Sequence, residues 1–103
     1  MKIVKVTYTV QSSFVQQNQE NIRTFINDVA SISDSGIRYH VYLGNDGKTF
    51  NHFAVYDNEQ AQKTLLELPS FKLFQQKRDA SGLEKEPTIE AMDFVAASYE
   101  IFN

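Results

Sequence analysis

The fold is decided by residues 36–56, which read Gly36-Ile37-Arg38-Tyr39-His40-Val41-Tyr42-Leu43-Gly44-Asn45-Asp46-Gly47-Lys48-Thr49-Phe50-Asn51-His52-Phe53-Ala54-Val55-Tyr56. Two runs rich in β-branched and aromatic residues meet here at a Gly-Asn-Asp-Gly turn, a pattern typical of a β-hairpin. Both histidines of the chain lie in this stretch. It therefore predicts two antiparallel strands in the middle of the fold. Any function of a histidine side chain would then depend on this hairpin.

The segments before the hairpin predict a strand and then a helix. Residues 2–10 alternate, with Val4, Val6, Tyr8 and Val10 on one face, as in a half-buried strand. From residue 16 to about 33, the apolar residues recur at helical spacing and form one stripe: Ile22, Phe25, Ile26, Val29 and Ile32. Residues 33–36, Ser-Asp-Ser-Gly, are predicted to end this helix.

The segments after the hairpin predict two more helical pieces and a last strand. Residues 57–59 begin a helix, Pro69 breaks it, and a short helix follows from Phe71 to about Arg78. Residues 80–87 are predicted as a loop and residues 88–98 as a strand. The order is β-α-β-β-α-β, which predicts an α+β fold: a single ferredoxin-like domain over residues 1–103 with a four-stranded antiparallel sheet.

The turn chemistry predicts a register for the hairpin. Residues 45–47 fit a three-residue loop, which places Gly44 opposite Lys48 and His40 opposite His52. One face of the ribbon then collects Arg38, His40, Tyr42, Phe50, His52 and Tyr56. The other face is more apolar and is expected to meet the helices; it collects Ile37, Tyr39, Val41, Leu43, Asn51, Phe53 and Val55.

Three interpretations of the paired histidines stay open. They form a hydrogen-bonded pair at an interface, or one of them polarises or deprotonates a small molecule in a pocket. A metal site would need a third ligand such as Glu90 or Asp93, and their spacing does not select them, so no metal is predicted. Four tyrosines on the strands could donate to a ligand oxygen, namely Tyr8, Tyr39, Tyr42 and Tyr56, although tyrosine is also common in strands for packing reasons.

The composition excludes several classes of function. A formal charge of −3 and a pI of about 5.3 argue against a nucleic-acid-binding surface, which needs a basic patch. The absence of cysteine excludes thiolate nucleophiles, iron–sulfur clusters and cysteine-ligated zinc. No apolar run approaches membrane-spanning length, and the alternating start is unlike a signal peptide. We expect a soluble, cytoplasmic protein without a cofactor.

The element order, the hairpin and the run Leu68-Pro69-Ser70-Phe71-Lys72-Leu73-Phe74 resemble the dimeric α/β-barrel superfamily, in particular its antibiotic-biosynthesis-monooxygenase-like branch. The resemblance implies a homodimer in which two ferredoxin-like protomers pack sheet against sheet. It also implies a pocket between sheet and helices for an aromatic or quinone-like molecule. Some members oxidise such substrates with O₂ and no cofactor, others degrade haem, and many have no known activity.

The chain departs from the pattern of that branch where activity would lie. Leu65 and Ser70 stand at positions where histidines occur, Ala54 stands where a glutamate is frequent, and tryptophan is absent. No catalytic residue therefore carries over, and only three aromatic residues match in type: Tyr56, Phe71 and Phe74. The residues predicted to line a pocket or an interface are His40, His52, Tyr42, Tyr56, Arg38, Phe50, Tyr8, Phe71 and Phe74.

Three functions are compatible with the sequence. The first is an uncharacterised dimer that binds a small apolar or aromatic molecule between sheet and helices. The second is a cofactor-independent monooxygenase acting on an aromatic or quinol substrate, with His40, His52 or a tyrosine assisting proton removal. The third is a structural or regulatory dimer with a filled core and no ligand.

Overall fold

The computed structural model describes residues 1–32 and 36–102, so residues 33–35, which were predicted to end the first helix, lie outside the described residues. One sheet has the strand order β2-β3-β1-β4, and neighbouring strands are antiparallel. This is the predicted ferredoxin-like arrangement. The elements are β1 (Lys2–Thr9), the short 3₁₀ helix η1 (Ser12–Phe14), α1 (Val15–Ser31), β2 (Ile37–Leu43), β3 (Thr49–Tyr56), α2 (Glu59–Glu67), α3 (Pro69–Ala80) and β4 (Lys85–Met92).

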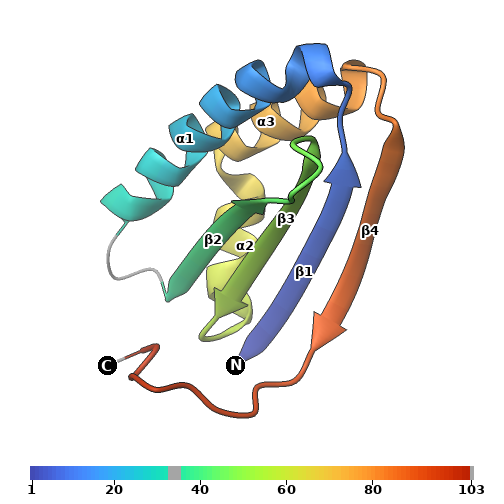
Figure 1. Ribbon diagram of the computed structural model, residues 1–103. Coiled ribbons are helices and arrows are strands. Elements are labelled where there is room, and N and C mark those ends of the chain that lie inside the picture. Colours follow the sequence, from blue (N-terminus) through green and yellow to red (C-terminus); the bar gives the residue numbers. More distant parts are fainter. Residues whose placement is uncertain (33–35, 103) are drawn as a thin grey trace.

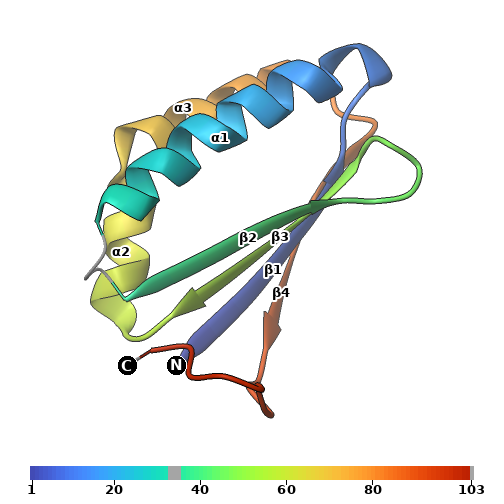
Figure 2. The same cartoon turned by 60° about the vertical axis from the view of Figure 1, so that its left-hand side comes forward.

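The molecule has two layers. All three α-helices cover one face of the sheet, and no helix or strand among the described residues covers the opposite face, which we call the open face (Figures 1 and 2). None of the helices in the described part of the chain has the length and hydropathy needed to cross a bilayer. The helical layer leaves β4 largely uncovered, since Ile89 points to the helix side of the sheet and is still 76% exposed.

The helix boundaries follow from local chemistry. The apolar stripe of α1 is buried at Ile22, Phe25 and Val29, as its spacing predicts. The α2 helix begins where the Asn58 side chain accepts a hydrogen bond from the backbone N–H of Ala61 at 2.9 Å. Pro69 ends α2 and begins α3, because its fixed φ suits the first turn of a helix but not the interior.

The predicted hairpin register is wrong by one residue on β3. Gly44 pairs with Thr49, donating its backbone N–H to the Thr49 carbonyl at 2.8 Å, so the loop contains four residues, 45–48. Gly47 is left-handed, with φ of 76°, a conformation that glycine adopts without strain. The Asp46 carboxylate accepts hydrogen bonds from the backbone N–H groups of Lys48 and Thr49, which holds the extra residue in the loop.

The shift moves every β3 side chain to the other face. His40 lies opposite Phe53, and Val41 lies opposite His52. His52 therefore faces the helices while His40 is exposed on the open face. The histidines do not form a cross-strand pair, so both the interface pair and the two-histidine metal site are wrong for this fold. The described residues contain no group of three His, Asp or Glu side chains placed to hold a metal.

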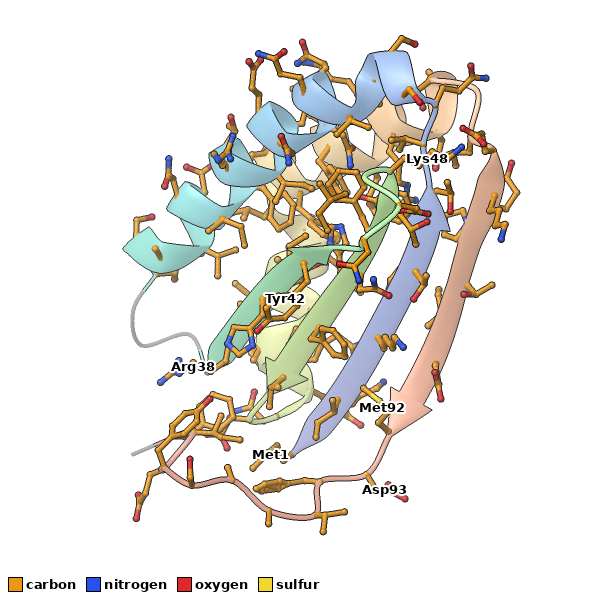
Figure 3. All side chains as sticks on the ribbon, in the orientation of Figure 1. Met1, Arg38, Tyr42, Lys48, Met92 and Asp93 are labelled. Carbon is orange, nitrogen blue, oxygen red and sulfur yellow. The ribbon has the colours of Figure 1, made fainter. Side chains whose placement is uncertain are left out.

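Both faces of the hairpin have a different composition from the predicted one. The residues toward the helices are Ile37, Tyr39, Val41, Leu43, Phe50, His52, Ala54 and Tyr56. The open face carries Arg38, His40, Tyr42, Asn51, Phe53 and Val55 from the hairpin. Figure 3, which looks onto the open face, shows Arg38 and Tyr42 on it.

The last strand lies earlier in the sequence than predicted. It spans Lys85–Met92 rather than residues 88–98, and it tolerates Pro87 because it is an edge strand. Residues 93–102 then run past the end of the sheet to its β2 side (Figure 1). There the Arg38 Nε donates to the Ile101 carbonyl at 3.0 Å, and its guanidinium lies 4.8 Å from the centre of the Phe102 ring.

Candidate functional site

A cavity of about 400 Å³ lies between the sheet and the helices α2 and α3. This volume is in the range of small-molecule sites. The cavity opens along β4, where the lining residues Ile89 and Ala91 are exposed. Its lining is mainly apolar with a few polar groups: Lys2, Val4, Val6, Tyr39, His52, Ala54, Tyr56, Gln62, Leu66, Phe71, Gln75, Ile89 and Ala91.

Four polar side chains form a hydrogen-bonded line behind the cavity, which we call the polar row: Asn18, Tyr8, His52 and Tyr39. The Asn18 Nδ2 donates to the Tyr8 hydroxyl oxygen at 2.9 Å, and that oxygen lies 2.8 Å from the His52 Nε2. The Tyr39 hydroxyl oxygen lies 2.8 Å from the His52 Nδ1. His52 and Tyr39 line the cavity, whereas Asn18 and Tyr8 are almost fully buried, at 0% and 1% exposure.

Burial keeps the polar row uncharged. It lowers the pKa of His52 to about 3, helped by the nearby charge of Arg78. It raises the pKa values of the Tyr8 and Tyr39 hydroxyls well above their usual range. Burial also raises the pKa of Tyr56, at the same cavity, to about 12. At neutral pH the site thus presents a neutral imidazole and protonated phenols.

Aromatic rings hold His52 in place. The Phe74 ring is stacked on the imidazole with 5.4 Å between ring centres, and Phe25 is stacked on it at 6.4 Å. Phe71 packs edge-on against Phe25 at 5.1 Å and also lines the cavity. The helix run that begins at Pro69 therefore supplies one wall of the site. Such a rigid aromatic surround fixes the direction of the imidazole nitrogens.

The predicted site residues fall into three groups. His52, Tyr56 and Phe71 line the cavity. Three others are buried next to it without lining it: Tyr8 and Phe74, which contact His52, and Phe50, which is stacked on Tyr8 at 5.6 Å. The remaining three, Arg38, His40 and Tyr42, lie on the open face, and none of them lines the cavity.

The sequence predicts Tyr8, Tyr39 and His52 as possible polar contacts of a ligand, but it predicts neither their hydrogen-bonded arrangement nor the part that Asn18 takes in it. Tyr39 was assigned to the helix side and His52 to the opposite side, so their contact could appear only with the four-residue loop. The position of Asn18 is itself a signal, because it lies on the apolar stripe of α1, four residues before Ile22. A buried polar residue on such a stripe points to a hydrogen-bonded partner inside the core.

A second hollow, of about 370 Å³, lies between α1 and β2. Tyr39 lines both hollows, but His52 lines only the one next to β4. The hollow at α1 is bounded by Gln19, Ile22, Arg23, Ile26, Tyr39, Val41, Tyr42, Leu43 and Phe50. We consider the β4-side cavity the candidate site, because it combines an apolar lining with buried, hydrogen-bonded polar groups.

Comparison with known proteins gives the fold a context. No protein-family model and no curated protein sequence matches the chain. Among solved structures, it is similar to an antibiotic biosynthesis monooxygenase, with 12% identity, a TM-score of 0.77, and coverage of 93% of this chain and 100% of that one.

Two further structures come from named bacteria and are provisionally described as antibiotic biosynthesis monooxygenases. The protein from Caulobacter crescentus has 18% identity and a TM-score of 0.79, covering 92% of this chain and 90% of its own. The protein from Deinococcus radiodurans has 18% identity and a TM-score of 0.67, and the match covers 98% of this chain and 99% of that protein. At these identities the likeness concerns the fold.

Proposed function

Because the chain has the ferredoxin-like fold found in antibiotic biosynthesis monooxygenase-like proteins, we propose that it binds a small apolar or aromatic molecule between its sheet and its helices. The observation that carries the proposal is the cavity of about 400 Å³ at α2, α3 and β4. A ligand-free structural role is less well supported, because it calls for a filled layer between sheet and helices.

The lining fits a flat, two-ring molecule. Val4, Val6 and Ile89 offer aliphatic surface from β1 and β4, and Phe71 offers an aromatic wall from α3. Burying apolar ligand area against these side chains contributes about 25 cal/mol for each Å². The hydroxyl groups of Tyr39 and Tyr56 supply polar contacts that orient a ligand, whereas both nitrogens of His52 are engaged by Tyr8 and Tyr39.

Binding is testable with 1,4-naphthoquinone, a two-ring probe that has no thiol to modify in this cysteine-free chain. We expect saturable binding in isothermal titration calorimetry and a higher midpoint of thermal unfolding at saturating probe, since a ligand that binds only the native state stabilises it. The related probes naphthalene and 1-naphthol extend the panel. A flat titration for all three would contradict the proposal.

The second candidate is cofactor-free oxidation of an aromatic or quinol substrate. It is favoured only by the presence of His52 and two tyrosines at the cavity. Both imidazole nitrogens are already hydrogen-bonded, and a pKa of about 3 makes this imidazole a weak base. We therefore rank binding above oxidation. In an oxygen electrode, 1-naphthol and 1,4-naphthoquinol are expected to consume O₂ no faster with the protein than without it; a protein-dependent rate would reverse this ranking.

We also propose a homodimer formed through the open face. No described helix covers that face, and residues 99–102 lie only against its end at Arg38 and Val55. The face carries apolar side chains, among them Ile3 and Phe53, next to the exposed Tyr42. A sheet of four strands of seven or eight residues offers a surface of roughly 20 by 25 Å. A second copy is the simplest partner for such a surface.

The dimer proposal predicts the mass of the protein in solution. Sedimentation equilibrium at micromolar concentration is expected to give twice the chain mass of 11.8 kDa. The variant Phe53→Asp, which places an unpaired charge in the centre of the open face, should give the monomer mass, while Lys63→Asp on the exposed side of α2 should stay dimeric. A monomeric parent protein would contradict the proposal.

A further inference from the structure

The contacts of the polar row determine which of its side chains donates and which accepts in each hydrogen bond. Its four members come from four different elements, namely α1, β1, β3 and β2, and three of them are at most 2% exposed: Asn18, Tyr8 and His52. Each contact is 2.8 or 2.9 Å, so each is a full hydrogen bond with one donor and one acceptor. A neutral imidazole donates through one nitrogen and accepts through the other.

The direction of the row starts at Asn18. Its Nδ2 group can only donate, so the Tyr8 oxygen accepts there. The single Tyr8 hydrogen then needs an acceptor, because a buried unpaired donor is costly. Within the described residues, the only acceptor in contact with that hydroxyl is the His52 Nε2. The Nε2 must therefore be unprotonated.

The rest of the row follows. A neutral His52 with a bare Nε2 carries its proton on Nδ1 and donates it to the Tyr39 oxygen. The Tyr39 hydroxyl hydrogen is then not used within the row, and no other acceptor for it occurs among the described residues. Tyr39 lines the cavity beside His52. The opposite arrangement would turn the Asn18 amide round, so that Tyr8 donates to Asn18, Nε2–H donates to Tyr8, and Tyr39 donates to Nδ1.

We propose that the polar row holds His52 in its Nδ1–H form and so directs the Tyr39 hydroxyl hydrogen into the cavity, where it binds a carbonyl oxygen on an aromatic ligand such as an aryl ketone or a quinone. The ligand class rests on the proposed function of the cavity. Tyr39 is then a binding residue, and Tyr8 and Asn18 are positioning residues that act through His52. A protonated phenol favours a neutral carbonyl, because no proton needs to move on binding.

The packing supports the assignment of donors. In the described orientation the Asn18 amide leaves its Oδ1 and one of its two Nδ2 hydrogens without a partner, whereas the turned amide would pair Oδ1 with Tyr8 and leave both Nδ2 hydrogens unpaired inside the core. The two orientations thus differ by one unpaired carbonyl oxygen against one further unpaired N–H, and buried N–H groups without a partner are the rarer of the two in proteins, which favours the described orientation. The Tyr8 ring is held by its neighbours. It packs against the rings of Phe50 and Phe74, and the Arg78 guanidinium lies 5.3 Å from its centre.

The first test determines the tautomer of His52 in the ligand-free protein. Long-range ¹H–¹⁵N correlation spectra of ¹⁵N-histidine-labelled protein distinguish a protonated from a bare ring nitrogen, and His40 serves as the exposed comparison. We expect His52 to be Nδ1–H. The variant Tyr8→Phe keeps the ring but removes the donor to Nε2, and it should lose this single-tautomer signal. An Nε2–H tautomer in the parent protein overturns the inference whatever any probe does.

The second test measures whether the Tyr39 hydroxyl binds the carbonyl oxygen of the ligand. In Tyr39→Phe, the affinity for 1,4-naphthoquinone is expected to fall about tenfold, while the affinity for naphthalene, which has no acceptor oxygen, stays the same. An equal loss for both probes, or no loss for either, overturns the proposed contact. If His52 is Nδ1–H but neither probe binds the parent protein, the proposed function fails and the ligand class falls with it, whereas the direction of the polar row stands.

Discussion

Replacing Ala91 by Phe is expected to weaken the binding of 1,4-naphthoquinone by more than tenfold, a loss of about 1.4 kcal/mol or more. Ala91 lies on β4 at the mouth of the cavity. A benzyl group placed there occupies part of a space of about 400 Å³ that a two-ring probe needs. Since Ala91 is exposed, the substitution should change the free energy of unfolding by no more than about 0.5 kcal/mol.

The matched control for this prediction is Ala91→Ser, which changes the volume little and should bind the probe like the parent protein. Calorimetric titrations of all three proteins provide the comparison, and thermal unfolding confirms that each is folded. Parent-like affinity in Ala91→Phe would place the probe outside the β4-side cavity. A loss in Ala91→Ser would show that the effect does not depend on filled space.

Acid is expected to destabilise the parent protein through His52. The pKa of this imidazole is about 3 in the folded protein and about 6.5 in an unfolded chain, because burial disfavours the charged form. Between these values the unfolded chain binds the extra proton, so stability rises with pH and falls as the pH drops below about 6.5. From pH 7.5 to pH 5.0 the expected loss is about 2 kcal/mol.

Urea unfolding at these two pH values measures the effect. In His52→Gln, which keeps a polar side chain without a titrating imidazole, the loss attributable to this site should disappear, so the variant becomes less pH-dependent than the parent by about 2 kcal/mol. The control His40→Gln changes the exposed histidine on the open face and is expected to keep the parent's pH dependence. An unchanged pH dependence in His52→Gln would mean that His52 is not buried in a neutral form.

Much of the fold follows from the sequence because short-range patterns determine it. The alternation at Val4, Val6 and Tyr8 predicts that these residues share one face of β1, and the stripe through Ile22 and Phe25 predicts the buried face of α1. Pro69 marked the break between α2 and α3. These features depend on residues within one or two turns of each other, where periodicity and backbone chemistry are decisive.

The candidate site was harder to predict because it depends on one loop residue. The carboxylate of Asp46 adds Lys48 to the turn, and this single residue decides whether His52 meets Tyr39 or His40. The predicted end of β4 was wrong because strand-like composition alone does not show whether a segment has a partner strand. Apolar residues after Met92, such as the 94%-exposed Val95, look like a strand in the sequence but have no pairing partner in the sheet.

The central claim, that a small aromatic molecule binds between β4 and the helices α2 and α3, is tested most directly by intermolecular nuclear Overhauser effects from bound 1,4-naphthoquinone to assigned methyl groups. The account predicts contacts from the probe's ring protons to Val4, Val6 and Ile89, which line that cavity. Contacts only to Ile22, Ile26 and Val41, which line the hollow at α1, or no contacts at saturating probe, would contradict it.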